Sequence, residues 1–522
     1  MRTGPTPGWQ AAILAAVTVA VFLPTLSSGF VYDARLQILT DPFLHDPWNW
    51  LPVLSFGVLG MDVLDFNRPV HLASLMLDAA IWGRNPFGYH LTSVLLHALN
   101  VVLVWRVVSD VLGSGPTDTS GERAGFGLSA FLAALFFAVH PVVTEAVCEP
   151  TFREDLLAAT FTLGALVIAA GSATAEAGLS WRGIGCAMCC LFAVASKESG
   201  VAAPFLLAVQ WWLHGGRERT RFWTVAIAGG LALVGMFLAA RFLLETIPSR
   251  IFESRPGYPG GSLAAALLLE PRILALYAQL VVLPVNLCAD YGLVSVRHVP
   301  LWAAAIVLAA LALGGWLAAR RDPRVLFGIA LVVVPLVPVS NLVPIYRAAA
   351  DRYLYLPLAG VACLVGCLLD RAFRSANEQR RQVTIVAALA ALVVLAAACV
   401  GRQAVWADSL ALWEDTFSRN PASYTAATGA SSARRLAGRT EEAIAAARTA
   451  VEISGGARGD AWLTLALAYD AAGLLDDADA AAAKAVEIDP RLADPDARVT
   501  ALAMERDEAE AAKKVLARRP VR

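Results

Sequence analysis

The sequence is short of charge. Only 16% of its 522 residues are Asp, Glu, Lys or Arg, whereas 57% are hydrophobic; soluble domains average about 25% charged residues. This deficit excludes an ordinary water-soluble globular protein, because so much apolar surface could not be hidden from water. A basic surplus is also missing, since the formal net charge is -1 and counterion-release binding needs a concentrated basic surface. We therefore expect no nucleic-acid partner.

A disulfide framework is absent as well. Most of the eight cysteines lie in apolar runs, where a small apolar helix residue accounts for each: Cys186, Cys189, Cys190, Cys363, Cys367 and Cys399. Cys186-x-x-Cys189 has redox or zinc spacing, but no second pair or histidine lies near it in the sequence. A pairing of Cys148 with Cys288 is left open.

What the chain does have is a series of apolar runs about long enough to cross roughly 30 Å of hydrocarbon. They predict eleven membrane spans, near residues 9–28, 91–112, 126–147, 154–172, 182–196, 199–214, 222–244, 300–319, 325–345, 353–370 and 382–401. The first run is longer than a signal-peptide core, so we predict a retained span. The stretch 262–285 is either a further span or a helix lying in the interface.

Basic loops decide between these two topologies, because short loops rich in Arg and Lys stay cytoplasmic. The strongest are Arg217, Arg219 and Arg221; Arg320, Arg321 and Arg324; and Arg371, Arg374, Arg380 and Arg381. The three basic loops lie on the same side of the membrane only if the stretch 262–285 does not cross it. The N-terminus is then inside, the loops 29–90 and 245–299 are outside, and everything after the last span is extracytoplasmic.

Residues 1–401 are therefore predicted to form the membrane domain, and residues 402–522 a second domain with charged, alanine-rich helices. Two segments of this domain align at a period of 35 residues, Gly438-Arg-Thr-Glu-Glu-Ala443 with Gly473-Leu-Leu-Asp-Asp-Ala478. A glycine turn followed by a helix with small alanines is typical of tetratricopeptide repeats. The alternative is a plain pair of helical hairpins.

Charged residues gather at the predicted outer ends of the spans. They are Asp33, Arg68, Glu145, Arg153, Glu154, Lys197, Glu198, Arg347, Asp351 and Arg352. A charge at a helix centre costs roughly 2.5 to 3.5 kcal/mol on insertion scales, so charges in or beside spans tend to mark substrate pathways. Any single one can be a snorkelling or helix-end charge. As a set they predict a polar site at the outer membrane surface, and its cations suit a phosphate-bearing ligand.

These charges are embedded in distinctive motifs: Asn85-Pro-Phe-Gly-Tyr-His90 with Leu95-Leu-His-Ala98, Phe137-Ala-Val-His-Pro-Val-Val-Thr-Glu-Ala146 with Arg153-Glu-Asp-Leu-Leu157, Ser196-Lys-Glu198, and Asp351-Arg-Tyr-Leu-Tyr-Leu-Pro357. Over nearly its whole length the chain resembles the transmembrane and tetratricopeptide-repeat-containing O-mannosyltransferases and their bacterial relatives. The resemblance implies an all-α GT-C glycosyltransferase of a bacterial inner membrane. Such an enzyme is expected to transfer mannose or another hexose, with inversion, from a polyprenyl-phosphate carrier to the hydroxyl of a protein Ser or Thr.

The resemblance also implies roles for individual residues. Asp33, in Phe30-Val-Tyr-Asp33, takes the position of the general base, while Arg352 and Arg347, followed by Lys197 and Arg153, are expected to bind the donor phosphate. Supporting roles fall to Glu154, Glu198, Arg68, His140 and Tyr353. The family often has two consecutive acids, whereas Ala34 follows Asp33 here; the second acid is then missing or replaced by Asp41 or Asp46.

The sequence also allows other residue roles and other functions. His140 and His71 are weaker candidates, because a histidine in an aromatic loop is more often a structural hydrogen-bonder. No tight metal-ligand spacing such as H-E-x-x-H occurs, so no metal site is assigned. Carboxylates and histidines share the predicted site, which leaves a divalent metal open, and the lipid-linked sugar is the expected donor. The other expected partners are a protein or glycan acceptor and a protein bound by the repeats. Alternative functions are a membrane-anchored scaffold without catalysis and a transporter of a lipid-linked precursor, although a transporter should carry mid-span charges and repeated helices.

Overall fold

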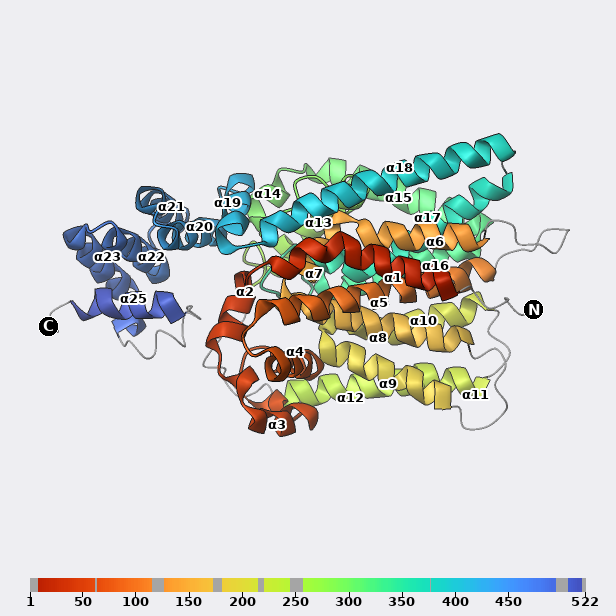
Figure 1. The fold of residues 1–522 in the computed structure, drawn as a ribbon, viewed down its shortest axis with the longest axis horizontal. Coiled ribbons are helices and arrows are strands. Elements are labelled where there is room, and N and C mark those ends of the chain that lie inside the picture. The colour runs from red at the N-terminus through yellow and green to blue at the C-terminus, as the bar shows by residue number, and fades with distance from the viewer. Residues whose placement is uncertain are drawn as a thin grey trace.

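The computed structural model describes residues 8–61, 63–114, 126–171, 181–214, 220–244, 257–375, 377–493 and 506–518. Arg217, Arg219 and the start of the predicted loop 245–299 lie outside these ranges. Throughout the described ranges the regular structure is helical and contains no strand. Figure 1 shows a long bundle of helices with a small helical domain at one end. The predicted all-α class is confirmed.

Each of the eleven predicted spans overlaps a helix of the bundle, although the helix ends at Val139 within the span 126–147 and at Val333 within the span 325–345. These helices are α1 (Gly8–Phe22), α5 (Pro86–Gly113), α6 (Phe126–Val139), α8 (Arg153–Ala170), α9 (Trp181–Ser196), α10 (Ala202–Leu213), α12 (Gly229–Leu244), α15 (Leu301–Arg321), α16 (Pro323–Val333), α17 (Tyr355–Ser375) and α18 (Glu378–Gln403). Within the described residues, seven helices are long and apolar enough to cross a membrane, or eight if the bent pair Gly127–Val139 and Pro141–Cys148 is one span. The chain is an integral, multi-pass membrane protein. The count of eleven spans stays a prediction.

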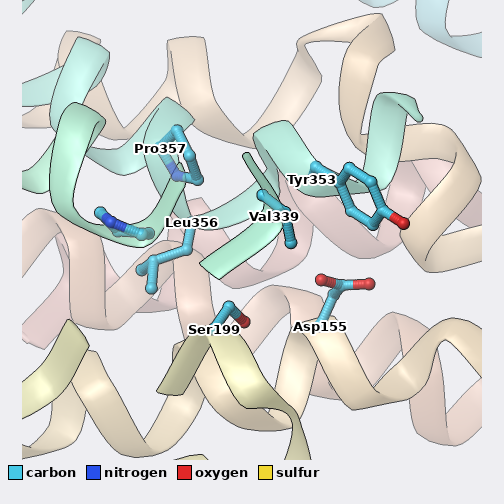
Figure 2. A pocket seen from close by; sticks show the side chains of 7 residues that line it. Asp155, Ser199, Val339, Tyr353, Leu356 and Pro357 are labelled. Carbon is cyan, nitrogen blue, oxygen red and sulfur yellow. The ribbon is translucent and has the colours of Figure 1, made fainter. Parts of the chain in front are cut away.

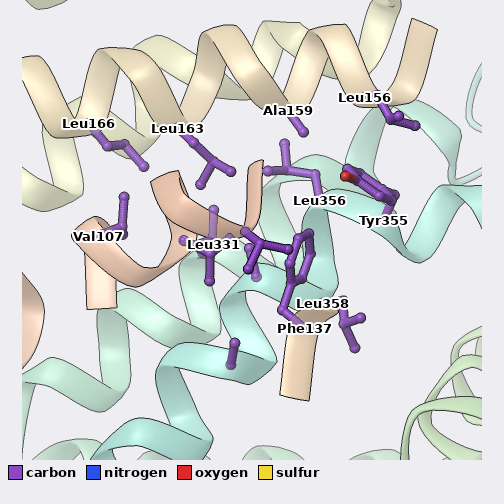
Figure 3. Packing of buried hydrophobic residues seen from close by; sticks show 14 of the residues in the cluster. Val107, Phe137, Leu156, Ala159, Leu163, Leu166, Leu331, Tyr355, Leu356 and Leu358 are labelled. Atoms are coloured by element: carbon purple, nitrogen blue, oxygen red, sulfur yellow. The ribbon is translucent and has the colours of Figure 1, made fainter. Parts of the chain in front are cut away.

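Close packing holds the bundle together. Figure 3 shows Phe137 of α6, Leu163 of α8 and Leu331 of α16 meeting in its interior. Between α16 and α17 the backbones approach so closely that a Cβ on Gly360 would lie 2.6 Å from the backbone nitrogen of Val332. Small residues allow such an approach between membrane helices, where packing rather than hydrophobic burial drives association.

The two ends of the bundle differ. At the end away from the small domain, Arg324 forms an ion pair with Asp370 at 2.8 Å and donates a hydrogen bond to the carbonyl of Leu112 at 3.3 Å. Short segments gather at the opposite end, among them α2 (Tyr32–Ala34), α3 (Trp50–Leu54), α4 (Pro69–Trp82) and α14 (Gly292–Arg297) (Figure 1). The predicted outer charges lie at this second end.

Helix α13 (Leu263–Val282) is long and apolar enough to cross a membrane, but both of its ends contact the end of the bundle that carries the small domain. Just before the N-terminus of α13, Gly260 lies close to Arg297 at the end of α14. A Cβ added to Gly260 would be 3.2 Å from Nη2 of Arg297. At its C-terminus, Nε2 of His140 donates to the carbonyl of Val281 at 3.0 Å. A helix that crossed the bilayer would place these two ends on opposite sides.

The small domain contains α19 (Ser409–Arg419), α20 (Tyr424–Leu436), α21 (Thr440–Ile453), α22 (Gly459–Ala471), α23 (Leu475–Ile488) and α25 (Arg506–Ala517). We call it the C-terminal domain. Gly438 and Gly473, which are 35 residues apart, have φ of +76° and +75°. This left-handed conformation favours glycine and ends a helix sharply. The matching turns agree with the predicted period, while the tetratricopeptide assignment stays a prediction.

The cysteine pairing left open by the sequence does not form, because Cys148 and Cys288 are both free. The Sγ atom of Cys148 lies 3.3 Å from Oγ1 of Thr25, and the thiol of Cys288 donates to the carbonyl of Asp290 at 3.3 Å. The two thiols therefore serve separate local contacts.

Candidate active site

Asp33 lies in the short turn α2, directly after the extended Val31 and after Tyr32, whose φ is +50°. Its side chain is accessible to solvent, and its carboxylate has no hydrogen bond or ion pair with any residue that the structure describes. Crowding by surrounding protein raises the pKa of Asp33 above its ordinary value of 3.8, while Arg352 and Arg347 oppose that rise. A carboxylate with unused acceptor capacity thus faces open space close to two cations.

Arg352 belongs to η12 (Asp351–Leu354) and is held by Glu145 of α7 (Thr144–Cys148). The guanidinium forms an ion pair with Glu145, and the backbone N–H of Arg352 donates to the same carboxylate at 2.8 Å. The guanidinium carbon also lies 4.0 Å from the ring centroid of Phe152. Two contacts to one carboxylate and a cation–π contact fix this cation in place.

Arg347 lies in the segment before η12. Its Nη1 contacts Oδ1 of Asp290 at 3.0 Å and Oγ1 of Thr425, in the C-terminal domain, at 3.2 Å. Its guanidinium carbon is 5.8 Å from the ring centroid of Tyr32. A cation of the site is thereby bound to both domains.

A cluster of ion pairs, in which basic and acidic side chains alternate, lies next to Arg352 and Arg347. Nζ of Lys197 lies 3.0 Å from Glu154 and 2.5 Å from Asp155. Arg68 pairs with Glu154, with Asp65 at 2.7 Å and with Glu198 at 3.2 Å. The ring of Tyr353 links this cluster to Arg352, because its centroid is 5.2 Å from both Nζ of Lys197 and the guanidinium carbon of Arg352.

A small cavity opens beside Tyr353. It is lined by Asp155, Ser199, Pro335, Val339, Tyr353, Leu356 and Pro357. Figure 2 shows Asp155 and Tyr353 on one side of it and Leu356 and Pro357 on the other. The cavity therefore has a polar side next to the charged cluster and an apolar side between η11 (Val334–Val339) and the start of α17.

Glu149 is a neighbour of Asp33 that the sequence did not reveal. Its Oε1 accepts the backbone N–H of Ala34 at 3.1 Å and the hydroxyl of Thr151 at 2.6 Å. Burial raises the pKa of Glu149 well above its ordinary value, and the charge of Asp33 acts in the same direction. An acidic side chain from a different loop therefore lies beside the Asp33 turn. Glu149-Pro150, just after the Phe137–Ala146 motif, was the available signal.

Asp41 and Asp46, the replacements considered for the second acid, instead cap turns. Asp41 accepts the N–H of Phe43 at 2.9 Å, and Asp46 accepts the N–H of Trp48 at 3.0 Å. Such local hydrogen bonds are the usual work of Asp in a turn. Neither placement supports a catalytic role.

Two other predicted site residues are not brought to the cluster. Arg153 is fully buried, with Nη2 2.6 Å from Asp78 and 2.8 Å from the carbonyl of Tyr89, and with Nη1 3.0 Å from Oγ of Ser74. This leaves its guanidinium no direction in which to bind a donor phosphate. His140 is buried too and holds the end of α13 through Val281. Arg153 is part of a motif, but adjacent residues on α8 point to different surroundings. Its place in the motif therefore did not put its side chain in the cluster.

His71 lies near the cluster, with both ring nitrogens buried and without a hydrogen-bond partner among the described residues. One ligand atom each from Asp65, His71 and Glu154 lies within 4.8 Å of the others. This is the spacing of a metal site, but Arg68 already pairs with both carboxylates. A cation would have to displace that guanidinium, so the arrangement fits a metal ion poorly.

The fold and the site define a multi-pass membrane protein in which one end of the helix bundle carries a free carboxylate beside paired cations. No family model matches the chain. The chain is 22% identical over 440 residues to the protein O-mannosyl-transferase F38B6.6 of Caenorhabditis elegans, an alignment that covers 78% of this chain and 57% of the relative. It is 25% identical over 472 residues to the protein O-mannosyl-transferase TMTC4 of Mus musculus, covering 80% and 62%. A shorter alignment, with mouse TMTC2, is 31% identical over 205 residues and covers 38% and 23%.

These similarities confirm the resemblance predicted from the motifs. The aligned part spans about half the length of the curated relatives, between 23% and 62% in these three. A solved structure, ArnT from Cupriavidus metallidurans bound to undecaprenyl phosphate, is similar with a TM-score of 0.42 and 15% identity, covering 97% of this chain and 88% of that one.

Proposed function

We propose that this protein is a glycosyltransferase that moves a sugar, mannose or another hexose, from a polyprenyl-phosphate carrier to a hydroxyl acceptor. The observation that carries the proposal is the free carboxylate of Asp33, for which Arg352 and Arg347 are the two strongest cationic neighbours. Similarity to O-mannosyl-transferases over most of the chain supports the reaction class.

The residues divide the reaction between them. Asp33 accepts the proton of the acceptor hydroxyl as that oxygen attacks the anomeric carbon. The bond between the anomeric carbon and the phosphate oxygen breaks, and the polyprenyl phosphate leaves with the bonding electron pair. Arg347 and Arg352 stabilise the charge that develops on this phosphate. Direct displacement from the opposite face inverts the anomeric centre.

The small cavity beside Tyr353 marks where we place the start of the donor's lipid. Its polar wall adjoins Lys197 and Arg352, while Leu356 and Pro357 offer an apolar wall to the first carbons of an isoprenoid chain.

The topology belongs to the same proposal. We place the site and the C-terminal domain on the extracytoplasmic side of a bacterial inner membrane, with α13 lying along the outer interface. The shared location of both ends of α13, together with the basic loops at the opposite ends of the spans, supports this orientation. A protein Ser or Thr is the proposed acceptor, and the C-terminal domain is the proposed place for a protein partner to bind.

The test is transfer itself. Purified protein in detergent or vesicles is incubated with a panel of labelled polyprenyl-phosphate hexoses and Ser/Thr-rich acceptor peptides, and products are identified by mass spectrometry. Wild-type protein should glycosylate a peptide with at least one donor, and Asp33→Asn should not. Failure of well-folded protein with every donor and acceptor would favour the scaffold function.

A further inference from the structure

The segment that carries Asp33 runs along the end of α18 and the beginning of the C-terminal domain. Three contacts join them in register: Oγ1 of Thr25 donates to Oε1 of Gln403 at 2.9 Å, the N–H of Gly29 donates to the carbonyl of Ala407 at 2.9 Å, and the ring of Tyr32 stacks on Trp413 with centroids 5.4 Å apart. The chain leading to the proposed base is thus held by residues nearly 380 positions later.

Tyr32 is the critical residue of this segment. It is one of few described non-glycine residues with positive φ, a conformation that persists only where surrounding structure imposes it. Trp413 stacks on one side of its ring at an interplanar angle of 21°, and Phe152 meets it edge-on at 5.6 Å. Because Asp33 is the next residue, the orientation of the Tyr32 backbone sets the direction of its carboxylate.

Trp413 is itself held in a slot. A Cβ on Gly429 of α20 would lie 2.3 Å from Cδ2 of the indole, so only glycine leaves room for the ring. The loop between α19 and α20 is fixed to the membrane domain by Asn420, which donates to the carbonyl of Asp290 at 2.9 Å, and by Ser423, which donates to the Asp290 carboxylate. That carboxylate also pairs with Arg347.

We infer that the helical hairpin α19–α20 is part of the catalytic site, in which Trp413 positions Asp33 through Tyr32. This inference rests on the proposed function, and it assigns Trp413 as a positioning residue rather than one that touches substrate. The C-terminal domain is then required for turnover even with an acceptor that it does not bind.

The test compares Trp413→Ala, Trp413→Phe and Gly429→Ala in the full-length protein. Trp413→Ala should lower kcat about 10- to 100-fold, as expected when a reacting group is displaced by about 1 Å. KM for the donor should change little, because Asp33 acts on the acceptor hydroxyl. Trp413→Phe, which keeps an aromatic ring against Tyr32, should restore most of kcat. Gly429→Ala should resemble Trp413→Ala, since the added methyl displaces the indole.

Trp462→Ala is the matched control. Trp462 lies in α22, where its indole N–H donates to the carbonyl of Gly456 at 3.0 Å, so its loss perturbs the same domain away from the site. It should leave kcat near the wild-type value. An equal loss in Trp462→Ala and Trp413→Ala would overturn the inference in favour of general destabilisation.

Hydrogen exchange provides a readout that does not need turnover. Amides of residues 29–33 should exchange faster in Trp413→Ala than in wild type or Trp462→Ala. If wild-type protein transfers no sugar, the proposed function fails while this exchange measurement still tests the tether. Unchanged exchange, or faster exchange with unchanged kcat in an active protein, would overturn the positioning role.

Discussion

Oε1 of Glu149 accepts the backbone N–H of Ala34 at 3.1 Å, which ties the loop after α7 to the turn that carries Asp33. Glu149 is fully buried, and that burial raises its pKa well above its ordinary value, which favours the neutral form of the acid. We therefore expect Glu149 to support the turn that carries Asp33.

Glu149→Gln should keep near-wild-type transfer, because the amide oxygen can still accept the Ala34 N–H. Glu149→Ala removes the acceptor and should lower kcat by about tenfold, the cost of losing a hydrogen bond worth about 1 to 1.5 kcal/mol. Steady-state transfer rates of the two variants check this. A Glu149→Gln enzyme as inactive as Asp33→Asn would show instead that ionised Glu149 is needed.

Asp33→Asn should reduce kcat by about 10²- to 10⁴-fold, the usual contribution of a general base. Donor affinity should remain, because the asparagine has nearly the same shape and the cations are untouched. Equilibrium binding of labelled donor and single-turnover transfer separate the two effects. Near-normal transfer by folded Asp33→Asn protein would remove the base assignment.

The pH dependence of kcat/KM should show an acidic limb above the ordinary Asp value of 3.8, since crowding raises the pKa of Asp33 and the base must be ionised. Arg347→Gln removes a cation that favours the ionised form, so the pKa of Asp33 should rise further and the limb should move to higher pH. Trp413→Ala admits water to the site and should move it to lower pH. Identical profiles in all three proteins would show that another group titrates.

Arg153→Met should destabilise the protein without a specific effect on donor binding. The change leaves Asp78 buried without its cation, which typically costs about 3 to 5 kcal/mol. Thermal unfolding in detergent measures the loss, and adding Asp78→Asn should recover part of it. Arg352→Ala is the contrast, because it should weaken donor binding as well as rate. If Arg153→Met bound donor poorly at full stability, the phosphate role would return.

The orientation of α13 can be read by cysteine labelling. Ser262→Cys and Val285→Cys, one at each end of α13, should both react with a thiol reagent that cannot cross the membrane when it is added from outside. A C-terminal reporter that is active only in the cytoplasm should stay silent. Labelling of only one of the two cysteines from outside would show that α13 spans.

Hydropathy and basic residues were enough to predict the helices of the membrane domain, because a bilayer demands long apolar helices whatever their neighbours are. The same information identified α13 as apolar without deciding where its ends lie. The positions of these ends depend on contacts with residues such as Arg297 and His140, which the apolar pattern does not encode. The prediction that Arg352, Arg347, Lys197 and Glu154 lie near one another came from the predicted topology, which puts these charges at the same ends of the spans, and the structure brings these four to one end of the bundle.

The sequence by itself determined that this chain spans a membrane many times, ends in a repeated helical segment and concentrates its unusual charges at one end. Only the tertiary structure decided which charges stay available. Arg153 and Glu154 are neighbours in sequence, yet Arg153 is enclosed by Asp78, whereas Glu154 joins Arg68 and Lys197. Successive helix residues point about 100° apart, so each meets a different part of the fold. Glu149 and Trp413 reach the Asp33 turn from more than 100 and nearly 400 residues away, and packing alone creates such contacts.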